Sequence, residues 1–217
     1  MDWHQWHQGY QGGGLAGRLP LVQDQLRQAL TETRPGPIMI ISVCAGQGHD
    51  VIGVFQDGPR QADVRARLVE WDHRNVAEAQ RRVDAAGLGN IEVRQGDAGL
   101  TDAYVDAAPA QIVLLCGVFG SLTEPDINRT VGMLPQLCDE NAQVIWTAHR
   151  SSPDLYRQAS AAFDRHGLTR RHTDPDDRFG VTRHQLVTQP TPLQPGRRMF
   201  EFADEQTLID IGRITLS

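Results

Sequence analysis

The sequence predicts an α/β protein built on a doubly wound, mostly parallel β-sheet. Short apolar runs rich in β-branched residues recur along the chain, and helical patterns separate them. A glycine-rich turn follows the first of these runs directly. Strands that alternate with helices form parallel sheets, which bind their ligands at the carboxyl ends of the strands.

The first elements follow an arm, residues 1–14, that ends in consecutive glycines. Leucine and valine recur every three or four residues between Leu15 and Leu30, which predicts an amphipathic helix. Pro35 and its neighbours then end the helical pattern. The run IMIISVC, residues 38–44, is continuous and apolar, as is typical of a strand that is buried on both faces of a sheet.

The alternation continues toward the carboxyl terminus. Further strands are expected at 65–70, 91–95, 111–116, 142–149, 168–173 and 179–188, and helices at 75–86, 126–134 and 153–165. The short acidic link between the last two strands suits an antiparallel pair. We interpret residues 15–189 as one domain. Residues 190–217 form a C-terminal extension, for which an added strand and a dimer element are the alternatives.

Composition restricts the function. The formal net charge is -6, which argues against broad nucleic-acid binding, and all 21 basic residues are arginine. The absence of lysine excludes a phosphate-binding Walker lysine and a Schiff base. The three cysteines lack disulfide or zinc spacing, so we expect reduced thiols and no metal. With no secretory signal and no apolar run near the ~20 residues of a membrane helix, we expect a cytoplasmic protein without membrane contact.

The turn after the first strand is a candidate binding site. Cys44, Ala45, Gly46, Gln47 and Gly48 precede a helix that should begin near His49. Glycines permit a tight turn and a close approach of backbone to ligand, and a helix start directs free N–H groups toward it. A plain connection between strand and helix is the alternative, because Gly-x-Gly alone is a weak signal.

Carboxylates follow the next two expected strands. Glu70 ends the second strand, about twenty residues beyond the turn, where a nucleotide-binding sheet places an acceptor for ribose hydroxyls. Asp97 follows the third strand, where it can accept from an adenine amino group while the Ala98 N–H faces a ring nitrogen. A turn-forming aspartate is the alternative for Asp97, and Asp72 is interpreted as a helix N-cap.

The segments VCAGQGHD, LVEWDHRN, RQGDAG and QIVLLCGVFG together resemble the successive signatures of class I S-adenosylmethionine-dependent methyltransferases, over residues 38–149. The resemblance implies a Rossmann-like seven-stranded fold with one antiparallel strand, and S-adenosylmethionine as cofactor. It implies that the cofactor contacts Cys44, Ala45, Gly46, Gln47, Gly48, Glu70, Trp71, Asp97, Ala98, Cys116 and Gly117. In this scheme Glu70 holds the ribose, Trp71 packs on adenine, and Cys116 borders the sulfonium.

Several departures from the patterns of related enzyme families restrict the reactions that we expect. Val51 follows the turn where a dinucleotide fingerprint continues with glycine, so a nicotinamide-dependent oxidoreductase is the weaker alternative. Cys116 begins the segment where base-amino methyltransferases carry [DNS]-P-P-[YF], and it cannot replace a magnesium-binding aspartate. We therefore expect a methyl transfer to an oxygen or nitrogen nucleophile of a small molecule. An S-adenosylmethionine-binding protein without transfer is the non-enzyme alternative, and the chain is compatible with a homodimer.

Aromatic and histidine residues are candidates for the substrate side. Trp3, His7 and Tyr10 in the arm would form a helical lid, with docking of the arm onto the core as the alternative, and Phe119 lies beside the expected acceptor. His149 ends the fifth expected strand, where a histidine can act as a general base near neutral pH. A hydrogen bond to a loop is the alternative role for His149.

Overall fold

A computed structural model of the chain describes residues 17–56, 60–150, 154–175 and 179–214. Its centre is a seven-stranded sheet with the order β3-β2-β1-β4-β5-β7-β6. The strands are β1 (Ile38–Val43), β2 (Val64–Glu70), β3 (Ile91–Gln95), β4 (Ala110–Leu115), β5 (Cys138–His149), β6 (Leu168–Thr173) and β7 (Phe179–Leu186). β7 runs antiparallel to both of its neighbours, β5 and β6, and the other pairs are parallel. This confirms the predicted fold.

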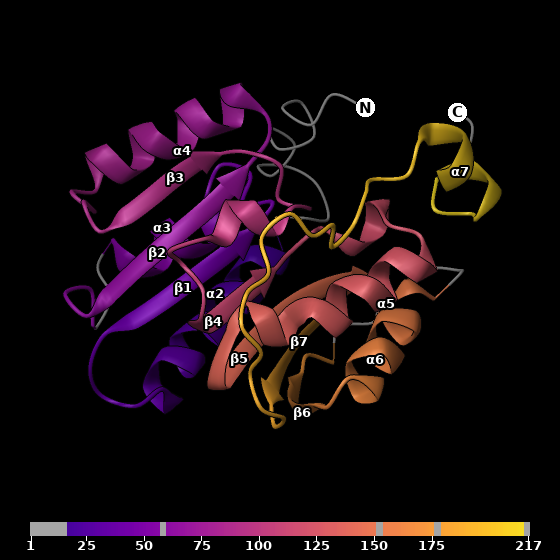
Figure 1. The fold of residues 1–217 in the computed structure, drawn as a ribbon. Coiled ribbons are helices and arrows are strands. Elements are labelled where there is room, and N and C mark those ends of the chain that lie inside the picture. Colours follow the sequence, from indigo (N-terminus) through magenta and orange to yellow (C-terminus); the bar gives the residue numbers. More distant parts are fainter. Residues whose placement is uncertain (1–16, 57–59, 151–153, 176–178, 215–217) are drawn as a thin grey trace.

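Helices cover both faces of the sheet (Figure 1). They are α2 (Arg18–Glu32), α3 (His49–Phe55), α4 (His73–Ala85), α5 (Glu124–Met133), α6 (Leu155–Arg165) and α7 (Glu205–Asp210), with short 3-10 helices η2 (Thr101–Tyr104), η3 (Phe119–Ser121) and η4 (Leu134–Gln136). One hydrophobic cluster joins α2, α3 and α4 to the sheet, and a second joins α5 and α6 to its other face. Within the described residues, no helix is long and apolar enough to cross a membrane.

Local chemistry explains where the helices begin. The Asp72 carboxylate accepts from the Arg74 N–H and caps α4, as expected from the sequence. Thr123 caps α5 in the same way, and Pro125 occupies the first turn, where its missing N–H costs no hydrogen bond. α5 therefore begins at Glu124, two residues before the predicted start at residue 126.

Several strand boundaries differ from expectation, most of them by one or two residues. β5 begins at Cys138 because Cys138 pairs with Ala110, and a register shift then carries the chain to the predicted run from residue 142. Asn141, with φ 62°, lies in this irregular stretch. Because its neighbours are polar, the sequence does not show the alternation or apolar run that would predict the start of the strand. β4 ends at Leu115, so Cys116 lies in the loop beyond it.

The C-terminal extension crosses the molecule as an extended segment between β7 and α7 (Figure 1). It forms no added strand, because its only bridge in the described residues pairs Leu100 with Arg198. Met199 and Phe200 are buried in the cluster under α5 and α6. The extension is thus part of the core, and it brings its charged and aromatic side chains to the carboxyl edge of the sheet.

Candidate functional site

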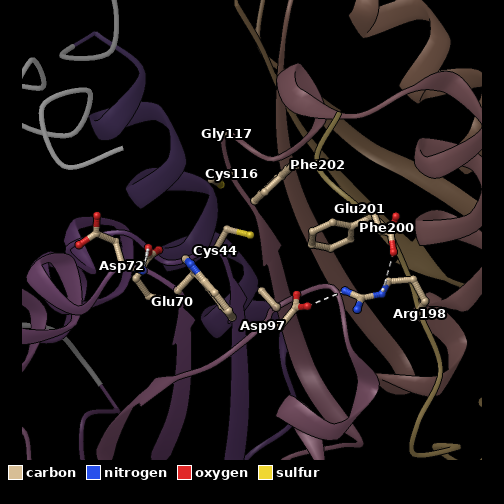
Figure 2. Close-up of a pocket in the computed structure, with 12 residues that line it drawn as sticks. Cys44, Glu70, Asp72, Asp97, Cys116, Gly117, Arg198, Phe200, Glu201 and Phe202 are labelled. Carbon is tan, nitrogen blue, oxygen red and sulfur yellow. Dashed lines mark hydrogen bonds and ion pairs between the residues drawn. The ribbon is translucent and has the colours of Figure 1, made fainter. Parts of the chain in front are cut away.

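A cavity of about 470 Å³ lies at the carboxyl ends of β1, β2, β3 and β4. Its wall consists of Cys44, Glu70, Trp71, Asp72, Asp97, Ala98, Cys116, Gly117, Arg198, Phe200, Glu201 and Phe202. Figure 2 shows Cys44 and Glu70 on one side of it, and the aromatic rings of the C-terminal extension on the other. The volume is within the range of small-molecule sites.

The sequence suggested a tight turn after β1, and the glycines of this turn have a left-handed backbone. Gly46 has φ 56° and Gly48 has φ 72°, and Gly48 caps the start of α3. A Cβ atom on Gly48 would lie 2.8 Å from Cδ2 of Leu68, so the turn packs directly against β2. The left-handed backbone favours glycine at both positions, and a side chain at Gly48 would also displace the ends of Ile52 and Leu68.

The Glu70 carboxylate holds this turn to the end of β2. Its Oε2 accepts from the Gly46 N–H at 2.8 Å, and its Oε1 accepts from the Asp72 N–H at 2.9 Å. Burial raises the pKa of Glu70, while these two backbone N–H groups oppose the shift. Each carboxylate oxygen has a second lone pair, so Glu70 can accept further hydrogen bonds from a ligand.

Asp97 and Trp71 also line the cavity. Asp97 Oδ1 accepts from the Gly99 N–H at 2.8 Å, and Oδ2 pairs with Arg198 Nη1 at 2.5 Å. Trp71 is 68% exposed, so a large aromatic face is available at the cavity rim. Ala98 is buried, and its carbonyl accepts from the Tyr104 hydroxyl at 2.7 Å, which fixes the backbone next to Asp97.

Cys116 and Gly117 form the cavity wall after β4. The Gly117 N–H donates to Thr147 Oγ1 at 3.0 Å, which ties this loop to β5. Burial raises the pKa of both the Cys44 and the Cys116 thiols well above the ordinary range, and nearby carboxylates add to the shift. Both thiols are therefore neutral near pH 7 and poorly suited to act as nucleophiles.

A second cavity of about 140 Å³ shares Gly117 with the first. Its wall includes the basic residues Arg18, His149 and Arg213, but no carboxylate among the described residues. His149 is exposed, and its ring lies 4.5 Å from that of Phe179. Loss of solvation lowers the pKa of His149, and the Arg18 cation lowers it further, so its neutral form persists below pH 6.5.

Not every predicted residue lies on a cavity wall. Ala45, Gly46, Gln47 and Gly48 are not among the lining residues, and Gly46 acts behind the wall by binding Glu70. The expected position of Phe119 is wrong. It was expected beside the acceptor, but it is fully buried, with its ring 5.7 Å from that of Trp146, because a large aromatic ring gains most from the core.

The predicted lid residues Trp3, His7 and Tyr10 lie outside the described residues. Within the described part of the chain, no group of three or more His, Cys, Asp or Glu side chains could hold a metal ion. Pattern analysis did not find the wall residues Arg198, Phe200, Glu201 and Phe202. The only signal in the sequence is their mixture of aromatic and charged side chains. That mixture has no regular period, so it predicts neither a helix nor a strand.

Comparisons with known proteins agree with this architecture. A family model described as "Putative methyltransferase" matches residues 9–172, which is most of the chain. Curated proteins give no match. Among solved structures, an O-methyltransferase family 2 protein from Planctomyces limnophilus in complex with apigenin has 17% identity and a TM-score of 0.63. The CurJ carbon methyltransferase has 12% identity and a TM-score of 0.65.

The magnesium protoporphyrin IX methyltransferase from Synechocystis, solved with bound SAM, has 13% identity and a TM-score of 0.62. The matched region covers 78% of this chain and 80% of the Synechocystis protein. The other two comparisons cover 80% and 78% of this chain, but only 60% and 54% of those longer proteins.

The sheet order and the cavity at its carboxyl edge define the Rossmann-like class of methyltransferase folds. Because the family match spans most of its length, the chain belongs to that methyltransferase family. Its C-terminal extension lies beyond the matched residues.

Proposed function

We propose that this chain binds S-adenosylmethionine in the larger cavity and transfers its methyl group to an oxygen or nitrogen nucleophile of a small molecule. The observation that carries the proposal is a pair of cavities that share the wall residue Gly117. The larger has nucleoside-binding chemistry, and the smaller has a histidine suited to accept a proton. Membership of the methyltransferase family supports this choice of reaction.

The donor groups fit this cofactor. The Gly46 and Asp72 N–H groups and the Asn75 side chain hold Glu70 in place, and the carboxylate still has acceptor capacity for a ribose hydroxyl. Trp71 offers an exposed ring to the adenine. Asp50 Oδ1 is buried without a hydrogen-bond partner among the described residues, and the Cys116 thiol lies beside the same carboxyl group. Asp50 is not itself a wall residue, but Cys116 is, so a cationic group bound beside Cys116 would lie near a buried carboxyl group.

The smaller cavity suits the methyl acceptor. When bound, S-adenosylmethionine would supply an electrophilic methyl group on its sulfonium. The chain would orient the nucleophile, which can remove ~7–11 kcal/mol of the barrier through proximity. Neutral His149 would accept the proton that the nucleophile loses. The lining includes Arg18 and Arg213 without a carboxylate among the described residues, and this favours a neutral or anionic acceptor.

A methyl-transfer assay tests the proposal. The full chain is incubated with methyl-labelled S-adenosylmethionine and a panel of small hydroxyl, carboxyl and amine compounds, and S-adenosylhomocysteine is measured. We expect label to appear on a neutral or anionic acceptor, together with an equal amount of S-adenosylhomocysteine. Binding of the cofactor without turnover on any acceptor would instead favour an S-adenosylmethionine-binding protein.

A further inference from the structure

The strap, residues 196–203 of the C-terminal extension, is fixed to the body along its length. The Thr101 N–H donates to the Arg197 carbonyl at 3.0 Å, and the Met199 N–H donates to the Gly99 carbonyl at 2.8 Å. At its far end, the Ala203 N–H donates to the Ser121 carbonyl at 2.9 Å. The strap is therefore an ordered wall of the larger cavity. Its lining residues are Arg198, Phe200, Glu201 and Phe202.

The turn after β3 is shaped to receive the strap. A Cβ atom on Gly99 would lie 2.4 Å from the Phe200 carbonyl oxygen, a distance that requires one of the two segments to move. A Cβ atom on Gly96, three residues earlier in the same turn, would meet nothing within 4 Å. Gly99 thus permits the close approach of the strap, and Gly96 offers a matched position where a side chain fits.

Arg198 of the strap fixes the direction of the Asp97 carboxylate. Its guanidinium pairs with Oδ2 (Figure 2). The Gly99 N–H of the turn holds Oδ1. Glu201 lies 3.6 Å from Arg198 Nε and helps to orient the guanidinium. The Asp97 side chain remains 35% exposed and lines the cavity, so its remaining lone pairs are accessible to a ligand.

The ion pair between Arg198 and Asp97 is better explained by a role in ligand binding than by a contribution to the stability of the fold. The side chains of Arg198 and Asp97 are each more than a third exposed, and ion pairs with such access to water stabilise folds weakly. Without Arg198 the Asp97 carboxylate would be held only by the Gly99 N–H, and its remaining freedom would be lost when a ligand binds, which weakens affinity. Arg198 removes that cost by holding the carboxylate in one direction before the ligand arrives.

We propose that Arg198 is a positioning residue that aims the Asp97 carboxylate at the amino group of the bound adenine, so that strap docking and cofactor binding stabilise each other. The inference rests on the proposed function. It also makes the strap, which lies outside the family match, a determinant of cofactor recognition.

The test compares two nucleosides in calorimetric titrations of the full chain. S-adenosylhomocysteine carries the adenine amino group, and S-inosylhomocysteine has an oxygen in its place. Arg198→Gln should weaken binding of the adenosyl ligand by about tenfold, since a previously ordered side chain must now be ordered on binding. Binding of the inosyl ligand should change less than about twofold, and Arg198→Lys should recover part of the loss.

Matched variants separate this role from general damage to the wall. Arg197→Gln alters an exposed side chain on the same strap and should bind both ligands as the wild type does. Gly99→Ala should displace the strap and weaken adenosyl binding, whereas Gly96→Ala should not. In hydrogen exchange, S-adenosylhomocysteine should slow the Met199 and Ala203 amides in the wild type, and less so in Arg198→Gln.

Three results would overturn the inference, namely unchanged adenosyl binding in Arg198→Gln, tighter binding in that variant, or equal losses for both nucleosides. Failure of the wild type to bind S-adenosylhomocysteine would instead refute the proposed function. The two failures are therefore distinguishable.

Discussion

A single carboxylate, that of Glu70, connects three segments of the site. It accepts from the glycine turn after β1 and from the backbone that leads into α4, and it is itself the last residue of β2. These contacts orient the carboxylate before a ligand binds. They also mean that replacing Glu70 with alanine would loosen the turn, so a glutamine of nearly equal size is the better probe.

His149 is the residue whose proposed role is most sensitive to pH. Its pKa is lowered by loss of solvation and by the Arg18 cation, so turnover should rise with pH through a value below the ordinary ~6.5. His149→Gln should lower turnover by ~10²–10⁴-fold and remove this rise, while cofactor affinity stays nearly constant. Initial rates across pH, with an acceptor found in the labelling assay, measure both effects.

The control for this variant is His172→Gln, on β6 and outside both cavities. It should leave the rate and its pH profile unchanged. If His149→Gln retains near-normal turnover with the wild-type profile, His149 is structural. A change confined to the KM of the acceptor would assign it to orientation alone.

Among single residues, those that follow a strand were the most predictable. Glu70 and Asp97 could be placed because each ends or follows a predicted strand, and parallel strands bring such positions to one edge. Phe119 could not be placed, because an aromatic residue just after a strand suits a cavity wall and a core equally well. Its contact with Trp146 depends on the packing of β5, η3 and α6.

At the scale of elements, β5 and β7 are joined by a buried polar contact. Trp146 Nε1 donates to His184 Nδ1 at 3.0 Å, and both side chains are fully buried. Burial lowers the pKa of His184 to about 3, and Arg170 contributes to the shift. The neutral imidazole therefore serves as the acceptor for the indole across this antiparallel pair.

This contact predicts a loss of stability in mild acid. Below about pH 6.5 the unfolded chain binds a proton at His184 that the folded chain does not take up until about pH 3. The free energy of unfolding should therefore fall as pH decreases through this window, by about 2 kcal/mol between pH 7 and pH 5 from this group. Urea unfolding at both pH values measures the fall.

Comparison with His184→Gln isolates this contribution from those of other groups. The variant should be less stable at pH 7, by about 1–3 kcal/mol, because the buried indole N–H loses a well-placed acceptor. Its further loss between pH 7 and pH 5 should be smaller than that of the wild type. Equal losses in the two proteins would show that His184 is not the group responsible.

The strap is the element that could not be predicted. Its residues have neither the period of a helix nor the alternation of a strand, because it pairs with the body through scattered single hydrogen bonds. Arg198 and Asp97 lie 101 positions apart in the chain, so no local spacing links them. The alternating strands and helices were predictable because each carries its own hydrophobic pattern.

At the scale of the whole molecule, the sheet order places the site. The chain turns from β1 outward to β2 and β3 and then returns to β4 on the other side of β1, which creates a switch point between β1 and β4. Cys44 follows one of these strands and Cys116 follows the other, and both line the larger cavity. The strap then closes the opposite wall.

The central claim is that this cavity binds S-adenosylmethionine through Glu70, and calorimetric titration with S-adenosylhomocysteine and with NADH tests it most directly. The wild type should bind S-adenosylhomocysteine in the micromolar range without added metal. Glu70→Gln should weaken that binding by roughly 10- to 150-fold, equivalent to ~1.5–3 kcal/mol for hydrogen bonds to a charged group. Glu140→Gln, an exposed position on β5 outside both cavities, should bind as the wild type does. Tight binding of NADH without binding of S-adenosylhomocysteine, or an unchanged affinity in Glu70→Gln, would contradict the account.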